Sequence, residues 1–201
     1  MNLANTITVS RYPVLAITVL MLYYGGPIVR LVAAGMVVVL ILMDSLDGVV
    51  ARRRDETTLI GSALDIAADR AVEIVLWVVY ADLDLILPLI PIVVVARGTL
   101  TDAIRNVALQ HGYSAHRMMR SRVGHWLVAG SVMRTSYAIV KLVAFVLLAV
   151  ALGLTGERWG DAVLGAGRAA TWVALALCIA RGVPVLVEAP RFFRLLEQEA
   201  P

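Results

Sequence analysis

The sequence predicts an all-α membrane protein, a bundle of about six transmembrane helices with an interfacial amino-terminal segment. The 201-residue chain is 60% hydrophobic and only 16% charged, and its mean hydropathy is +0.84. Apolar stretches of about 20 residues, the length that crosses a bilayer as a helix, recur along the chain. This length also suits one domain, so we expect a single transmembrane domain over residues 1–201.

The apolar stretches can be taken in chain order. The first expected span covers about 7–25, and Met1 to Arg11 is expected to lead into it along the membrane interface. The next expected spans cover about 28–52, 58–81, 84–110, 133–154 and 161–187. The fourth of the six is the least regular, because Arg97, Asp102 and Arg105 interrupt its second half.

Basic residues predict how the bundle is oriented. Arginines gather between the second and third spans, between the fourth and fifth, and after the sixth, whereas Arg158 is the one cation in the links on the opposite side. By the positive-inside rule, both termini and the link 53–58 face the cytoplasm. The net charge of +3 and the pI near 9.3 fit contact with anionic lipid and give no reason to expect nucleic acid. We expect an integral protein of a bacterial or archaeal cell membrane.

Four aspartates lie inside apolar helical sequence and carry the functional prediction. Carboxylates at membrane depth are costly and usually mark function. Asp44 and Asp47 share one helix face with Gly48, and Asp65 and Asp69 share one face of the next span. If these spans pack antiparallel, both faces meet at one cavity, where a pair of divalent cations is the natural partner of four carboxylates.

The aspartates belong to a longer pattern, D-x-x-D-G-x-x-A-R-x8-G-x-x-x-D-x-x-x-D, over residues 44–69. This pattern resembles the signature of the CDP-alcohol phosphotransferase family of membrane enzymes. The resemblance implies transfer of a phosphoalcohol group from a CDP-alcohol to an acceptor hydroxyl, with release of CMP. It implies two Mg²⁺ or Mn²⁺ ions on the four aspartates, with Asp69 as general base, and a homodimer. The implied contacts to the CDP part are Thr8, Ser10, Gly48, Arg52 and Thr58.

Weaker matches concern the acceptor. The start N-x-x-N-x-x-T-x-x-R, from Asn2 to Arg11, resembles that of phosphatidylglycerophosphate synthases and the related cardiolipin synthases. The stretch from Arg97 to Arg105 is similar to one in the glycerophosphate enzymes, although Gly98 stands where a Glu is usual. The donor implied is CDP-diacylglycerol, and the acceptor is glycerol 3-phosphate, with inositol phosphate or phosphatidylglycerol as alternatives.

The charge of the acceptor provides a physical test of the glycerol 3-phosphate hypothesis. Glycerol 3-phosphate is a dianion and needs cations around it, which serine or inositol would not. Four arginines at or near membrane depth could supply them: Arg97, Arg105, Arg134 and Arg181. The structural alternative is that these arginines pair with Asp102 or Glu188, or extend toward the membrane surface.

A divalent-cation transporter is the competing class, because acidic residues on facing helices can form an ion pathway. No inverted repeat of broken helices is apparent in the sequence, and the acids cluster toward one membrane face, which favours the enzyme. The intact pattern also disfavours an inactive scaffold. Glu73 extends the Asp65–Asp69 face by one turn, and we expect it to be a buried partner of Arg70 or of another helix.

Overall fold

A computed structural model describes residues 3–53, 59–110 and 122–199. Within these ranges the chain forms seven helices and no strand, which confirms the all-α fold class. The helices divide into two compact units, and each is described by itself. Unit 1 contains residues 1–88 and 142–171, and unit 2 contains residues 89–141 and 172–201.

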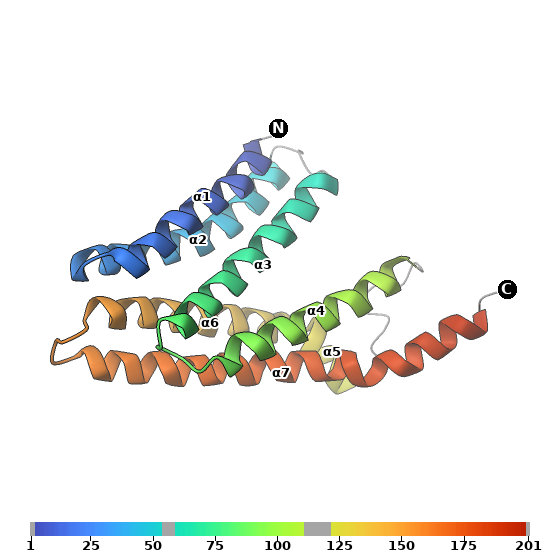
Figure 1. The fold of residues 1–201 in the computed structure, drawn as a ribbon. Helices are drawn as coiled ribbons and strands as arrows, with labels where there is room; N and C mark the ends of the chain where they lie inside the picture. Colours follow the sequence, from blue (N-terminus) through green and yellow to red (C-terminus); the bar gives the residue numbers. More distant parts are fainter. Residues whose placement is uncertain (1–2, 54–58, 111–121, 200–201) are drawn as a thin grey trace. The chain divides into compact units, whose positions relative to one another are not determined.

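Unit 1 is built around three amino-terminal helices, α1 (Leu3–Tyr24), α2 (Pro27–Arg53) and α3 (Leu59–Asp82). Helix α1 packs against both α2 and α3 (Figure 1). It does so with one stripe of buried side chains at helical spacing: Thr8, Arg11, Leu15, Thr18 and Leu22. The expected interfacial segment is therefore continuous with the first apolar helix, and Arg11 lies in the interior of unit 1.

The link between α1 and α2 is short because its residues suit a sharp reversal. Gly25 donates its backbone N–H to the carbonyl of Met21, and a Cβ at Gly25 would come within 2.3 Å of that oxygen. Only glycine fits such an approach. Pro27 then opens α2, a position where its missing N–H costs nothing. Arg30 completes the link by donating from Nε to the carbonyl of Leu22.

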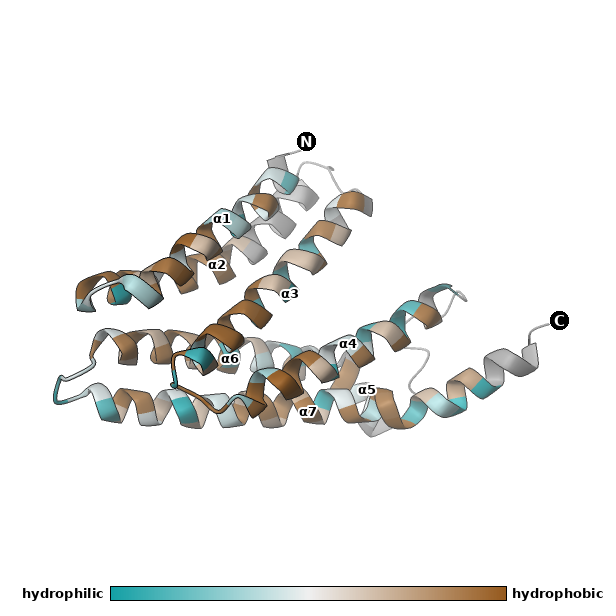
Figure 2. Ribbon diagram, in the orientation of Figure 1, coloured by the Kyte–Doolittle hydropathy of each residue, from teal (hydrophilic) through white to brown (hydrophobic). Residues whose placement is uncertain are grey.

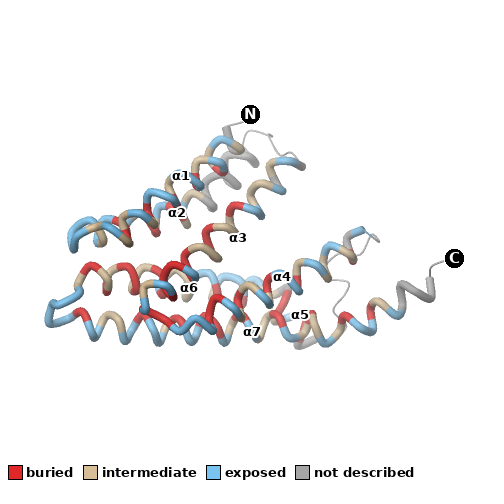
Figure 3. The backbone as a smooth tube through the Cα atoms, viewed as in Figure 1, coloured by how far each residue is buried: buried red, intermediate tan, exposed pale blue. Residues whose placement is uncertain are grey.

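The second half of α3 is its buried half (Figure 3). Trp77 meets Phe145 edge-to-face with ring centroids 4.5 Å apart, and the buried Tyr80 hydroxyl donates to the Phe145 carbonyl at 2.8 Å. Phe145 lies on α6 (Ser131–Gly153), whose second half belongs to unit 1. Hydrophobic residues predominate from Ile74 to Ala81, and the hydrophilic Asp82 ends the helix (Figure 2). The other charged residues of α3 lie between Asp65 and Glu73.

Unit 2 contains α4 (Leu89–Gln110), α5 (Arg122–Ala129), the first half of α6 and the part of α7 (Gly160–Glu199) from Trp172 onward. One part of its core contains four buried residues: Ala108, Val128, Val185 and Phe192. Helix α4 begins at Leu89 instead of near residue 84, because Asp84 takes a left-handed conformation (φ 58°) and Pro88 precedes the helix. The short helix α5 lies between two of the expected spans and was not predicted.

Hydropathy separates the helices further. Three described helical segments are long and apolar enough to cross a membrane: Asn5–Tyr24, Ser131–Gly153 and Gly160–Arg194. Helix α2 has a shorter apolar part, Pro27–Met43. Charged residues at 65, 69, 70 and 73 make α3 more polar than a typical span. Several apolar helices thus support an integral membrane protein, and six spans and a single domain over 1–201 remain predictions.

Candidate functional site

Helix α3 presents Asp65 and Asp69 one turn apart on the same face. Their side chains are half-exposed, at 48% and 50%, although Val72, Leu76 and Tyr80, further along the same face, are buried. Residues four apart on a helix are neighbours, so the two carboxylates repel each other unless a cation stands beside them. This part of α3 therefore needs a positive partner, as the sequence predicted.

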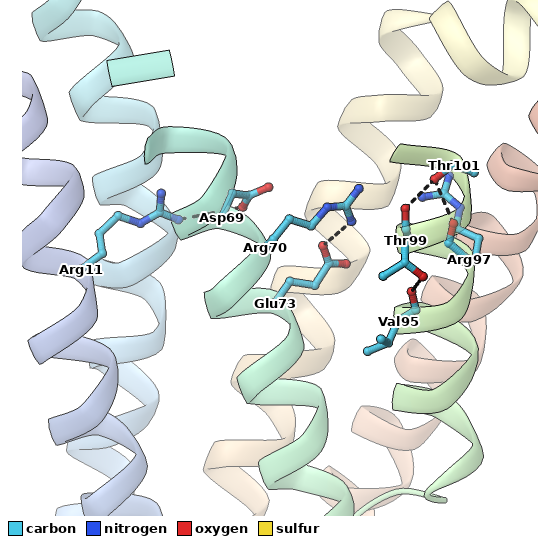
Figure 4. A network of polar contacts seen from close by, with 9 residues as sticks. Arg11, Asp69, Arg70, Glu73, Val95, Arg97, Thr99 and Thr101 are labelled. Carbon is cyan, nitrogen blue, oxygen red and sulfur yellow. Dashed lines mark hydrogen bonds and ion pairs between the residues drawn. The ribbon is translucent and has the colours of Figure 1, made fainter. Parts of the chain in front are cut away.

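The structure supplies one such partner that the sequence reasoning did not identify. Arg11 reaches from α1 toward α3, as Figure 4 shows for Asp69. Its Nη1 lies 3.9 Å from Oδ1 of Asp65, and its Nη2 lies 3.9 Å from Oδ1 of Asp69. The Arg11 side chain is only 1% exposed. A buried guanidinium is tolerated when carboxylates compensate its charge, and here two do.

A signal for Arg11 was present in the sequence. The buried stripe of α1 recurs at intervals of three and four residues, and Arg11 occupies one of those positions between Thr8 and Leu15. A charged residue in register with apolar positions of a membrane helix marks an internal partner. As the end of the expected interfacial segment, Arg11 was not predicted to lie beside Asp65 and Asp69.

The aspartates predicted on α2 can be placed only by their backbone. Helix α2 runs through residue 53, so Asp44 and Asp47 are separated by about one helical turn and share a face with Gly48. The side chains of Asp44, Asp47 and Arg52 lie outside the described residues, and so does Thr58. Whether Asp44 and Asp47 meet Asp65 and Asp69 therefore stays a prediction.

The described half of the aspartate set suits a divalent cation chemically. Asp65 and Asp69 offer carboxylate oxygens, the ligands that Mg²⁺ prefers, and both remain open on one side. Among the side chains that the structure describes, no group of three or more Asp, Glu, His or Cys residues could hold a metal ion. Two carboxylates and water can begin such a site, and the predicted set needs Asp44 and Asp47 to complete it.

The two hydroxyl residues predicted to contact the CDP part lie differently on α1. Thr8 is buried, on the same stripe as Arg11. Ser10 is partly exposed, and its hydroxyl donates to the carbonyl of Ile7 at 2.7 Å. That bond uses the only proton of the Ser10 hydroxyl, so toward a ligand Ser10 can serve only as an acceptor.

Glu73 lies one turn beyond Asp69 and is 4% exposed. Its Oε2 lies 3.6 Å from Nη1 of Arg70 (Figure 4). This pairing confirms the expectation that Glu73 is a buried partner of Arg70. Along the acidic face of α3, the carboxylates of Asp65 and Asp69 are therefore half-exposed beside Arg11, whereas that of Glu73 is buried and paired with Arg70.

Unit 2 brings together the four arginines that the sequence analysis assigned to the acceptor phosphate. Arg181 on α7 lies within electrostatic range of Arg97 and Arg105 on α4 and of Arg134 on α6. We call these four residues the arginine cluster. Like charges gathered on three helices repel, and this repulsion is relieved when an anion binds among them.

Local contacts hold the members of the arginine cluster in place. The Arg181 guanidinium lies over the ring of Tyr137, 5.6 Å from its centroid. Gly182 leaves room for Arg97, since a Cβ at Gly182 would lie 2.6 Å from the Arg97 Nε. The Nε atoms of Arg97 and Arg181 are buried and have no hydrogen-bond partner among the described residues. Buried donors of this kind suit an anionic ligand.

Comparison with known proteins agrees with this chemistry. A family model, CDP-alcohol phosphatidyltransferase, matches residues 1–180. The match covers α1 to α6, both described aspartates and three of the four clustered arginines, and ends one residue before Arg181. No curated protein matches the chain. The match spans most of the 201 residues, so the chain belongs to the CDP-alcohol phosphatidyltransferase family.

Proposed function

We propose that this CDP-alcohol phosphatidyltransferase uses CDP-diacylglycerol as its donor and glycerol 3-phosphate as its acceptor. The family supports a transferase that moves a phosphatidyl group from a CDP-alcohol, and it favours this class over a cation transporter. In the proposed reaction, the acceptor hydroxyl oxygen bonds to the lipid-side phosphorus and the pyrophosphate bond breaks. CMP leaves, the hydroxyl proton passes to the general base, and phosphatidylglycerophosphate remains in the membrane.

The arginine cluster is the observation that carries the choice of acceptor. Glycerol 3-phosphate brings a dianionic phosphate that does not react, and binding this phosphate requires positive charge around it. A neutral alcohol would bring no negative charge to Arg97, Arg105, Arg134 and Arg181, whose mutual repulsion an anion would relieve. Guanidinium groups match phosphate oxygens in both charge and geometry. A phosphorylated acceptor therefore suits unit 2 better than serine or inositol.

The donor side of the proposal rests on unit 1. Asp44, Asp47, Asp65 and Asp69 would hold two Mg²⁺ or Mn²⁺ ions, which when bound neutralise the pyrophosphate and the departing CMP. Asp69 accepts the hydroxyl proton, a role that its half-exposed carboxylate permits. The nucleotide and its phosphates are assigned to Thr8, Ser10, Gly48, Arg52 and Thr58.

A panel of acceptors tests this assignment directly. Purified protein receives CDP-diacylglycerol and Mg²⁺ or Mn²⁺, and CMP release is measured with glycerol 3-phosphate, inositol phosphate, inositol, serine or phosphatidylglycerol. We expect release with glycerol 3-phosphate to exceed release with the other acceptors. Preference for inositol phosphate would keep the role of the arginine cluster and change only the acceptor. Preference for serine or inositol would contradict the role of the arginine cluster, and preference for phosphatidylglycerol would indicate cardiolipin synthesis.

A further inference from the structure

We propose that Arg11 is a built-in counter-cation for the carboxylates of α3. In the metal-free protein, its buried guanidinium holds Asp65 and Asp69 side by side, so that α3 keeps its place against α1 without a bound ion. The metal-dependent part of this inference rests on the proposed role of the two aspartates as metal ligands. The interaction between Arg11 and the aspartates does not.

The geometry shows how one side chain serves two carboxylates. Nη1 of Arg11 faces Asp65 and Nη2 faces Asp69, each 3.9 Å from an Oδ1 atom, so the guanidinium bridges one helical turn of α3. Without it, two negative charges at positions i and i+4 would repel. Without the carboxylates, a guanidinium that is 1% exposed would have lost its hydration and also these two opposite charges. Each side therefore stabilises the other.

The positions of the exposed surfaces show why Arg11 leaves Asp65 and Asp69 accessible to a metal ion. Arg11 approaches from the interior of unit 1, whereas Asp65 and Asp69 are half-exposed on their other side. An N–O distance of 3.9 Å is longer than a hydrogen bond, and each carboxylate has about four lone-pair positions. The carboxylates thus keep oxygen atoms for a second cation while Arg11 stays in place.

A counter-cation has a different signature from an ordinary packing residue. If Arg11 neutralises the aspartates, its removal should matter most when no metal ion does so. Loss of Arg11 should therefore make the stability of the protein depend on metal. A residue that only fills space would contribute equally in the presence and absence of metal.

Thermal unfolding of the full chain in detergent measures this difference. Wild type, Arg11→Gln, Arg11→Lys and Arg30→Gln are melted in EDTA and in excess Mg²⁺ or Mn²⁺. We expect Arg11→Gln to lower Tm in EDTA by about 5 °C or more, and metal to restore most of that loss. Arg11→Lys keeps the positive charge, so its Tm in EDTA should lie between those of wild type and Arg11→Gln. Arg30→Gln is the matched control, because Arg30 caps backbone carbonyls of α1, and it should lower Tm equally in both conditions.

A double-mutant cycle with Asp69→Asn tests the carboxylate side in EDTA alone. In the wild-type background, Asp69→Asn removes a partner of Arg11 and should lower Tm. In the Arg11→Gln background, the same change relieves repulsion and should raise Tm. This sign reversal does not require metal binding.

Several outcomes would overturn the inference. Equal losses of Tm with and without metal would make Arg11 a packing residue. If metal raises the Tm of wild type but not that of Arg11→Gln, then Arg11 is required for metal binding. It would not then be a cation that takes the place of the metal. If metal stabilises neither protein, the proposed metal role fails, and the cycle in EDTA alone decides whether Arg11 is the counter-cation.

Discussion

Arg181 lies over the ring of Tyr137, with the guanidinium carbon 5.6 Å from the ring centroid. The same ring also receives Lys141, whose Nζ lies 5.4 Å from the centroid. Tyr137 follows Arg134 by three residues on α6, so Arg134, Tyr137 and Lys141 share one helix face. The ring of Tyr137 therefore fixes Arg181 beside Arg134 and helps to assemble the arginine cluster.

Replacing Arg134 or Arg181 with Gln should raise the KM for glycerol 3-phosphate by about ten- to a hundredfold. Each change removes a charge-assisted phosphate contact worth about 1.5–3 kcal/mol. The KM for CDP-diacylglycerol should change much less. Arg191→Gln, at an exposed position of the same α7, is the control and should affect neither constant. Equal effects on both substrates would separate the arginine cluster from the acceptor.

Asp65→Asn should abolish nearly all activity, and EDTA should do the same to wild type. Loss of a group that only hydrogen-bonds to a metal ligand already costs about 10- to 100-fold in activity, so loss of a direct ligand should cost about 100-fold or more. CMP release measured across a titration of Mg²⁺ or Mn²⁺ reports both effects. Full activity in EDTA would exclude the two-metal hypothesis.

Asp69→Asn should separate binding from turnover. The amide oxygen can still approach a cation, but the amide cannot accept the acceptor proton. Turnover should fall by about 10²–10⁴-fold, the usual contribution of a general base. The affinity for CDP-diacylglycerol should fall less than it does in Asp65→Asn. If affinity collapses while turnover of the bound complex survives, Asp69 is not the base.

Tyr80→Phe should destabilise unit 1 without affecting the choice of acceptor. The change removes a buried hydroxyl that donates to the Phe145 carbonyl at 2.8 Å and leaves that carbonyl short of one partner. We expect a loss of about 1–3 kcal/mol in the free energy of unfolding. Tyr24→Phe, at a largely exposed ring, is the matched control and should be nearly neutral. Equal stability of the two variants would contradict the structural role of this bond.

The orientation in the membrane can be tested by labelling. Glu56→Cys and Glu157→Cys should react with an impermeant thiol reagent from opposite sides of sealed cells, with Glu56→Cys protected from outside. The native Cys178 is buried and should give little background. Outside labelling of Glu56→Cys would reverse the predicted topology and remove access to CDP-lipid made in the cytoplasm.

Fold class, most helix positions and the aspartate pattern follow from the sequence alone, because they depend on local information. Apolar length and helical spacing are properties of neighbouring residues, so α1, α2, α3 and α6 appear close to their expected ranges. The eight residues of α5 are too few for such a signal, and the turn around Asp84 delays the start of α4.

Which charged side chains meet depends instead on the packing of distant helices. Arg11 is 54 residues before Asp65 in the chain (65 − 11), and no local rule links them. Packing α1 on α3 buries Arg11, and the cost of removing its charge from water makes the two carboxylates its partners. Arg97, Arg134 and Arg181 lie on three different helices, so their common position likewise depends on how α4, α6 and α7 pack within unit 2. Sequence spacing shows which residues share one helix face, but the partner of that face depends on long-range packing.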